Sequence, residues 1–179
     1  MPVRMARRTE RVDVVDDDDH VIATVSRAEM RARNLQHRAV SIAVLSSDGR
    51  LLVHRRAKTK DVWPGMWDIA AGGVVAAGEA YEDAARRELA EELGIVAENW
   101  QLLGEGRFAD DDVTMIGRAF LVVHDIVNGS PFRFTDGEIE EVRWVDRGEL
   151  EALLATETFV PDNVALLLPL LRAGCAQFH

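Results

Sequence analysis

The sequence has 179 residues, of which 47% are hydrophobic and 29% charged, and this balance predicts one globular domain with a full core. A formal net charge of −10 argues against a protein that coats nucleic acid, but it is compatible with an anionic substrate held by local cations or metal ions. Because no run reaches about 18 apolar residues and Cys175 has no cysteine partner, we expect a cytoplasmic protein without a membrane span.

The first 36 residues are predicted to form an extension ahead of the main domain. Residues 12–25 alternate in the manner of two short strands around an acidic turn, which we interpret as a solvated turn rather than a cation site. Ser26 begins a capping-box pattern, so a short helix is expected to follow it. The domain boundary is therefore placed between 1–36 and 37–179.

The next segment predicts a hairpin, a loop and an extended stretch. Two β-rich runs within 39–56 flank the turn dipeptide Asp48-Gly49. A loop with a Pro-Gly pair is expected over 58–67, followed by a small-residue extended segment over 68–75.

The strongest helical pattern covers residues 77–94. Its apolar residues repeat with the period of an α-helix, and Gly94 supplies a C-terminal stop. The apolar positions are Ala80, Ala84, Ala85, Leu89 and Leu93.

The remainder predicts further strands and two helices. The predicted elements are strands near 100–108, 113–125 and 139–145, a loop at 104–112, a capped helix at 147–155 and a last helix at 162–172. A mixed sheet with helices packed on it is the simplest architecture for this order of elements.

Three glutamates gather on one face of the strongest helix. Glu88, Glu91 and Glu92 have the spacing i, i+3, i+4, and like charges at that spacing repel one another. Carboxylate oxygens are the ligands that Mg²⁺ prefers, so this face is a candidate site for a hard cation. A solvated acidic surface is the alternative that these three residues alone leave open.

The residues around this face resemble the Nudix box, the defining motif of the Nudix hydrolase family. The positions that carry the resemblance are Gly73, Glu79, Arg87, Glu88, Leu89, Glu91, Glu92, Gly94 and Ile95. The resemblance implies an α/β/α sandwich around a mixed sheet, here with an N-terminal hairpin. It also implies cleavage of a nucleoside diphosphate linked to a variable group, by attack of water on phosphorus.

The resemblance further implies roles for the box residues. Glu88, Glu91 and Glu92 would ligate Mg²⁺ or Mn²⁺, together with a backbone carbonyl at Gly72 or Gly73, and would carry the catalysis.

Two supporting roles follow from the same family pattern. Arg87 is expected to pair with Glu79 and brace the loop against the helix. For the base that activates water, we favour Glu138 over the two glutamates that follow it, and Glu91 is the competing candidate.

A second resemblance covers roughly residues 35–95 and is to isopentenyl-diphosphate isomerase, a member of the same superfamily. It implies that Arg56 and Lys60 contact the substrate diphosphate. The isomerase's essential cysteine, however, falls on Gly72, and its adjacent metal-binding histidine falls on Val74. The acid needed to protonate an alkene is therefore missing, and we expect the hydrolase activity rather than isomerisation.

Aromatic and histidine residues near this segment have two interpretations each. Trp67 and Trp63 flank Pro64-Gly65 and could stack on a substrate base or pack on the core; Trp67 is taken as the substrate-binding candidate. His37 could contact a metal, but a structural hydrogen bond is the favoured interpretation.

The sequence thus predicts a metal-dependent pyrophosphohydrolase acting on a small-molecule diphosphate. The alternative in another class is a non-catalytic Nudix module that binds a nucleotide. We do not expect nucleic acid or a membrane as a partner. We do expect a homodimer, formed through the N-terminal hairpin.

Overall fold

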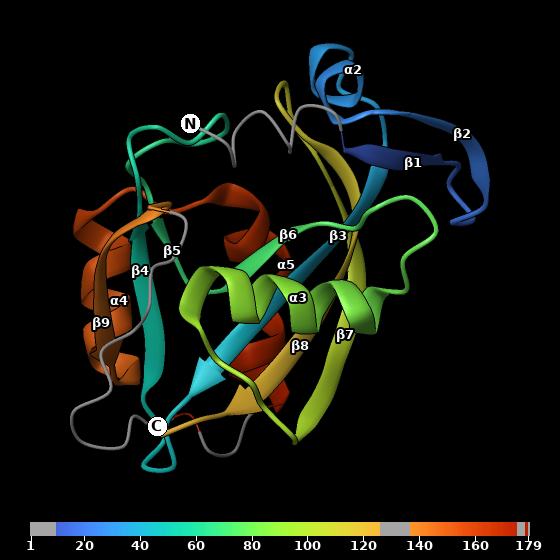
Figure 1. Ribbon diagram of the computed structural model, residues 1–179. Helices are drawn as coiled ribbons and strands as arrows, with labels where there is room; N and C mark the ends of the chain where they lie inside the picture. The colour runs from blue at the N-terminus through green and yellow to red at the C-terminus, as the bar shows by residue number, and fades with distance from the viewer. Residues whose placement is uncertain (1–9, 126–136, 175–177, 179) are drawn as a thin grey trace.

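A computed structural model describes residues 10–125, 137–174 and 178, and it forms one mixed sheet with helices on both faces (Figure 1). The strands are β1 (Arg11–Val15), β2 (Val21–Ser26), β3 (His37–Leu45), β4 (Leu51–Arg56), β5 (Trp67–Asp68), β6 (Ala71–Val74), β7 (Trp100–Ala109), β8 (Thr114–Val123) and β9 (Ile139–Val145). The helices are α2 (Arg27–Ala32), α3 (Tyr81–Leu93), α4 (Arg147–Thr156) and α5 (Pro161–Gly174).

Strand β3 is the centre of the sheet. It runs parallel to β8 over its whole length, from the pair His37–Met115 to the pair Leu45–Val123. It also pairs antiparallel with β6 and, at a single position, with β1. Since β6 carries the glycine segment, this pairing places the glycines against the middle of the sheet.

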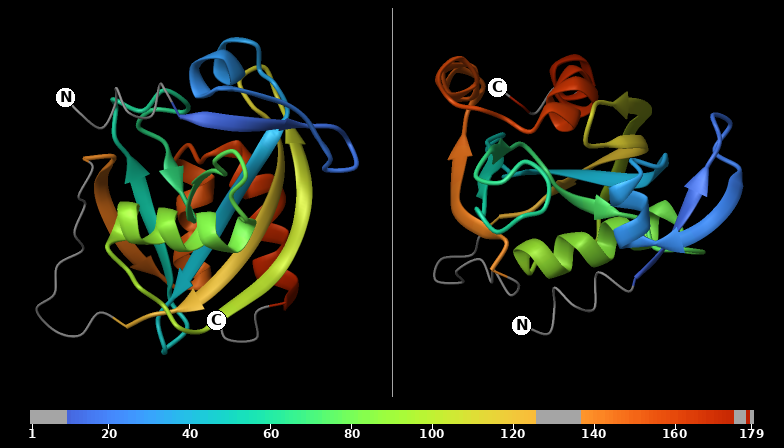
Figure 2. Two further views of the ribbon diagram at one scale, coloured as in Figure 1. Left: turned by 45° about the vertical axis from the view of Figure 1, so that its right-hand side comes forward. Right: turned by 90° about the horizontal axis from the view of Figure 1, so that it is seen from above.

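The two faces of the sheet pack against different helices (Figure 2). Side chains of a strand alternate between faces, so Ile42 and Val44 join α3 in one core cluster while Ala43 and Leu45 join α4 and α5 in another. The expected α/β/α sandwich around a mixed sheet is therefore confirmed.

The loop predicted at 104–112 is wrong, because β7 continues to Ala109 and turns only at the aspartates that follow. Its register with β8 extends to the pair Ala109–Thr114. The glycines here permit close packing: a Cβ at Gly106 would lie 2.8 Å from Leu166 of α5, and one at Gly104 would lie 3.2 Å from Leu170.

Two other boundaries differ from the prediction. The turn at Asp48-Gly49 is present, but β3 and β4 pair only at Leu45–Leu51, because each strand then continues beside other partners. Helix α3 begins at Tyr81 rather than at residue 77, since Gly78 has a left-handed φ of 75°. The cap at Gly94, with φ of 67°, is confirmed.

Residues 10–36 of the N-terminal extension join the sheet and share a small core cluster with β6. Val12 from β1 and Met30 from α2 are fully buried and pack against Val74 of β6. The predicted cap of α2 is confirmed by the Ser26 hydroxyl, which accepts a hydrogen bond from the Glu29 amide. No helix in the described part of the chain is long and apolar enough to span a membrane.

Candidate active site

Helix α3 directs two of its three clustered glutamates toward the sheet. Its alanine and leucine face is buried against the sheet, and this fixes the rotation of the helix. Glu88 and Glu92, one turn apart, are consequently 3% and 2% exposed. The side chain of Glu91 is 46% exposed, so it lies at the open edge of the site.

Strand β6 can approach these carboxylates closely because it contains two glycines. The Gly72 amide donates a 3.1 Å hydrogen bond to Glu92 Oε2. A Cβ at Gly73 would lie 2.5 Å from the Glu88 carboxylate, and one at Gly72 would overlap the backbone oxygen of Val40. A side chain at either position would therefore require a neighbour to move: the backbone of Val40 at Gly72 and the carboxylate of Glu88 at Gly73.

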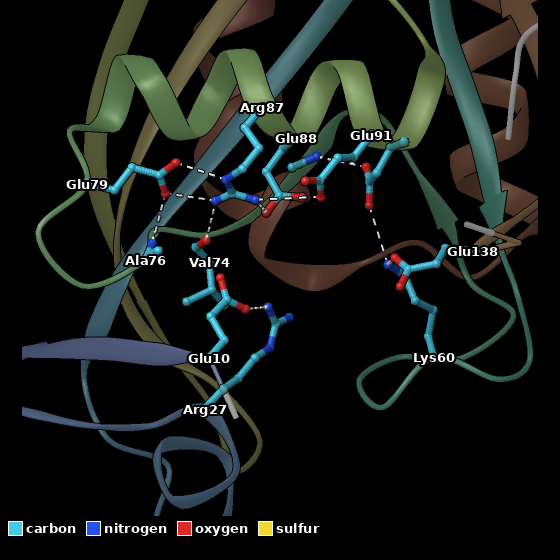
Figure 3. A network of polar contacts seen from close by, with 12 residues as sticks. Glu10, Arg27, Lys60, Val74, Ala76, Glu79, Arg87, Glu88, Glu91 and Glu138 are labelled. Carbon is cyan, nitrogen blue, oxygen red and sulfur yellow. Dashed lines mark hydrogen bonds and ion pairs between the residues drawn. The ribbon is translucent and has the colours of Figure 1, made fainter. Parts of the chain in front are cut away.

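Arg87 joins the loop before α3 to the helix (Figure 3). Its Nε and Nη2 donate to the two oxygens of Glu79 at 2.9 and 2.8 Å, and its Nη1 donates to Glu88 at 2.6 Å. Glu79 also accepts from the Ala76 amide, so the loop is held at several points. The hydrogen bonds that Arg87 donates to Glu79 raise the pKa of Arg87. The predicted pairing of Arg87 with Glu79 is present in the structure.

Lys60 connects the helix carboxylates with the favoured base candidate. Its Nζ lies 3.4 Å from Glu92 Oε1 and is also hydrogen-bonded to Glu138. Figure 3 shows Lys60 beside Glu138. Glu138, which immediately precedes β9, therefore lies close to Glu92 of α3. Residues 135 and 136, which precede it in the predicted loop, lie outside the described residues.

Arg56 lies on the same wall but is directed to other partners. Its Nη2 donates to the Val62 carbonyl at 2.9 Å, and its Nη1 lies 3.8 Å from Asp68. Arg56 and Lys60 line one cleft, and their binding of a diphosphate stays a prediction.

Trp67 does not lie at the substrate side, which corrects that expectation. Its indole is 2% exposed in the core cluster beneath α4 and α5, with the Arg143 guanidinium 4.7 Å from the ring centre. The short strand β5 pairs with β4 and turns this side chain inward. Trp63, which lines the cleft and meets Phe108 edge-on at 6.0 Å, is the tryptophan in reach of a ligand.

His37 is buried in the cleft wall with 1% exposure. Its Nδ1 lies 2.9 Å from the Leu35 carbonyl and so carries the proton of that hydrogen bond. Burial, with a contribution from the charge of Arg31, lowers the pKa of His37 to about 4, and the ring is neutral at pH 7. The geometry agrees with the structural interpretation.

Sequence reasoning missed a buried polar chain in the wall of the cleft. The Ser41 hydroxyl donates to Asn163 Oδ1 at 2.6 Å, and Asn163 Nδ2 donates to Asp68 Oδ1 at 2.7 Å. Burial raises the pKa of Asp68 to about 6, although His54 and Arg56 oppose this shift. These residues come from β3, β5 and α5, so no local pattern in the sequence could indicate their contact.

Two arginines of α2, Arg27 and Arg31, were also missed, although both line the cleft. Their i, i+4 spacing is visible in the sequence and places them on one face of the short helix. Only the fold shows that this face is turned toward β6, the strand that contains Gly72 and Gly73. There Arg27 donates a hydrogen bond to Glu10 (Figure 3).

The donor set fits a hard divalent cation. Glu88 and Glu92 are buried acidic groups beside the backbone of β6, and two such charges require compensation. In this structure Arg87 and Lys60 supply it, and no three His, Cys, Asp or Glu side chains among the described residues stand ready to hold a metal. A bound cation would supply the same neutralisation of these carboxylates.

Comparison with known proteins connects the site to a family. The family model of the NUDIX domain matches residues 35–167. A protein of Escherichia coli K12 named as the Nudix hydrolase YfcD is 40% identical over 167 residues, which cover 93% of this chain and 89% of that one. A Pseudomonas aeruginosa protein named as a Nudix hydrolase is also 40% identical, over 93% of this chain and 96% of its own length.

Solved structures share the fold. DR0079 from Deinococcus radiodurans superposes with a TM-score of 0.74 at 26% identity, over 91% of this chain and 98% of that one. The NUDIX domain of Shewanella oneidensis NrtR, solved as a complex with ADP ribose, gives a TM-score of 0.60 at 17% identity, over 83% and 97% of the two chains. The second likeness bears on the fold alone.

Proposed function

Because this chain belongs to the Nudix hydrolase family, we propose that it hydrolyses a diphosphate linkage in a small nucleoside-diphosphate-type substrate with the help of Mg²⁺ or Mn²⁺. The observation that supports this most strongly is that Glu88 and Glu92 lie beside the glycines of β6, with Lys60 3.4 Å from Glu92. Carboxylates, a close backbone and a nearby lysine are groups that suit a metal–diphosphate complex.

Glu88, Glu91 and Glu92 would hold the metal, with a backbone carbonyl at Gly72 or Gly73. When bound, a divalent cation supplies charge neutralisation at the diphosphate and lowers the pKa of an attacking water.

The remaining residues would bind and orient the substrate. Lys60 would leave its contact with Glu138 and bind a phosphate oxygen, while Arg56 binds another. Release from Lys60 would leave the Glu138 carboxylate able to accept a proton from the attacking water. Glu91, at the open edge of the site, is the alternative base.

The test is the release of phosphate and pyrophosphate from a panel of nucleoside triphosphates, dinucleotides, nucleotide sugars, ADP-ribose, coenzyme A and isoprenoid diphosphates. Each is offered with Mg²⁺, with Mn²⁺ and with a chelator. We expect turnover of one class that needs metal and falls at least about 100-fold in Glu91→Gln. Metal-independent turnover, or a rearranged diphosphate as product, would contradict the proposal.

A fold control accompanies this assay. Glu82 lies on an exposed part of α3, where its carboxylate is 3.7 Å from Arg118, so Glu82→Gln changes the same helix without touching the site. Equal thermal melting of both variants with loss of activity only in Glu91→Gln would support the proposal. Binding of a nucleotide without turnover anywhere in the panel would instead favour a non-catalytic binding module.

The oligomeric state and the location are proposed separately. Strand β2 is the outer edge of the sheet and exposes Val21 and Ile22, so the hairpin is the surface that we propose for a homodimer. Sedimentation of the wild type and of Ile22→Lys tests this, because a dimer through β2 should dissociate in the variant. A cytoplasmic location rests on the lone Cys175, which lies outside the described residues.

A further inference from the structure

The cleft contains two guanidinium groups with unsatisfied nitrogens. Nε and Nη1 of Arg31, on α2, are buried and have no hydrogen-bond partner among the described residues. Its ion-pair partner Asp61 lies 3.8 Å from Nε, which is beyond hydrogen-bond distance. Nε of Arg56 on β4 is also buried without a partner. Both groups line the same cleft, although they come from the extension and from the main domain.

This arrangement is costly unless an anion completes it. Burial lowers the pKa of Arg31 to about 10, and the like charges of Arg27 and Arg56 add to that effect, while Asp61 opposes it. Positive charges from two separate elements are thus held close together in a partly desolvated wall. A buried donor that lacks an acceptor costs free energy in its own right.

The acidic residues of the cleft do not supply the missing acceptors. Asp68 Oδ1 accepts from Asn163 Nδ2 at 2.7 Å and from the Ala70 amide at 3.2 Å. Asp162 Oδ1 accepts from the Asn163 amide at 2.6 Å. The side chain of Asp61 is 57% exposed and therefore lies at the rim.

We propose that Arg31, assisted by Arg27, binds a third phosphate group that the substrate carries beyond the diphosphate held at Arg56 and Lys60. The planar guanidinium offers paired donors that match phosphate oxygens. The N-terminal extension thereby takes part in substrate selection. This inference rests on the proposed function, because it assumes that the diphosphate occupies the neighbouring part of the cleft.

The first test measures anion binding alone, without metal and without turnover. Inorganic phosphate is titrated calorimetrically, in the presence of a chelator, into the wild type, Arg31→Gln and Arg33→Gln. Arg33 is the matched control, because it follows the same helix but is 63% exposed and bonded to Glu29. We expect phosphate to bind the wild type and Arg33→Gln equally and Arg31→Gln about tenfold more weakly.

Thermal melting excludes a purely structural role. Removal of a buried charge whose donors lack hydrogen-bond acceptors should leave the melting temperature of Arg31→Gln without phosphate unchanged or raised. Phosphate should then stabilise the wild type more than this variant. Equal phosphate affinity in Arg31→Gln, or no phosphate binding by the wild type, would overturn the inference.

The second test identifies the source of the third phosphate. Two substrate pairs each differ by one phosphate: a nucleoside triphosphate against its diphosphate, and coenzyme A against dephospho-coenzyme A. If the third phosphate continues the diphosphate as a triphosphate, the wild type should prefer the nucleoside triphosphate to its diphosphate. If it is a separate group elsewhere on the substrate, the wild type should prefer coenzyme A to dephospho-coenzyme A. In either case Arg31→Gln should lower the preference in kcat/KM about tenfold.

The two proposals fail in different ways. A wild type without preference in both pairs, or an unchanged preference in Arg31→Gln, would overturn the third-phosphate site while leaving the hydrolase intact. Absence of turnover with every substrate would overturn the proposed function, and the metal-free titration would still decide whether Arg31 binds phosphate.

Discussion

Gly72 and Gly73 set how closely the sheet approaches the carboxylates of α3, but they do so against different neighbours. A Cβ at Gly72 would overlap the backbone oxygen of Val40 in the paired strand, whereas one at Gly73 would lie 2.5 Å from the carboxylate of Glu88. The first neighbour is fixed by the β-ladder, and the second can turn away.

The two alanine variants are therefore expected to differ in kind. Gly72→Ala should lower the free energy of unfolding by about 2–4 kcal/mol, because backbone must move. Gly73→Ala should cost about 1 kcal/mol or less in stability but weaken Mn²⁺ binding by displacing Glu88. Denaturant titration and metal titration of both variants check this. Equal destabilisation would show that the Val40 backbone and the Glu88 carboxylate move equally easily.

His37 predicts a pH dependence of stability. Its folded pKa of about 4 is below the usual 6.5, so its contribution to stability is complete above pH 6.5 and is lost as the pH falls toward 4. Asp162 acts in the opposite direction, because burial raises its pKa to about 6. The wild type alone therefore mixes the two effects.

The difference between wild type and His37→Asn isolates the histidine. Any stability advantage of the wild type at pH 7 should shrink by up to about 3 kcal/mol between pH 7 and pH 4, since only the wild type must protonate a buried ring. Urea unfolding at several pH values measures it. A constant difference would mean that His37 titrates normally.

At the level of elements, the loop before α3 is held by one arginine. Burial favours a raised pKa for Glu79, but the hydrogen bonds from Arg87 and the Ala76 amide lower it overall. Since the contact is bidentate and half-buried, it should be stronger than an exposed ion pair.

Glu79→Gln should accordingly lower the free energy of unfolding by about 1–2 kcal/mol. Combined with Arg87→Lys, the two changes should cost less than the sum of the single changes, because they remove the same interaction. Chemical denaturation of the three variants gives this coupling. Strict additivity would show that Arg87 and Glu79 do not act together.

Local sequence patterns predict the type of most helices and strands, but they do not predict which elements pack against each other. The glutamate spacing, the cap at Gly94 and the capping box of Asp146 with Glu149 depend on residues within a few positions of each other, and the structure has all of them. The sequence predicts a strand near 100–108 but also a loop at 104–112, and the packing of Gly104 and Gly106 on α5, some sixty residues away, leaves no local signal that would exclude the loop.

The candidate site shows the same division. The family motif was sufficient to name the glutamates of α3, but the partition into buried Glu88 and Glu92 and exposed Glu91 depends on how α3 packs. Burial of Trp67 depends on helices late in the chain, and Arg31 enters the cleft only because β1 joins the sheet. Long-range packing of this kind leaves no periodic signal in the sequence.

On the scale of the whole molecule, residues 10–36 of the extension contact the main domain near the candidate active site. Val12 and Met30 cover Val74, and Asp13 accepts a 2.8 Å hydrogen bond from the Gly78 amide. The boundary that was predicted from sequence remains a prediction, but these contacts indicate that the two parts stabilise each other.

Two changes test this dependence. Met30→Ala should lower the free energy of unfolding by about 2–4 kcal/mol, because it empties a fully buried position. A chain that starts at residue 37 should melt at a lower temperature still, since it exposes Val74 and loses Asp13. Calorimetry of both proteins checks the expectation. An unchanged melting temperature in the truncated chain would show that the main domain folds independently of the extension.

The central claim is that the buried carboxylates of α3 bind the catalytic cation, and titration of Mn²⁺ into the wild type, Glu92→Gln and Glu82→Gln tests it most directly. Loss of one buried carboxylate ligand should weaken Mn²⁺ binding at least about tenfold in Glu92→Gln, whereas the exposed Glu82→Gln should bind as the wild type does. Equal affinity in all three proteins, or no binding to the wild type, would contradict the account.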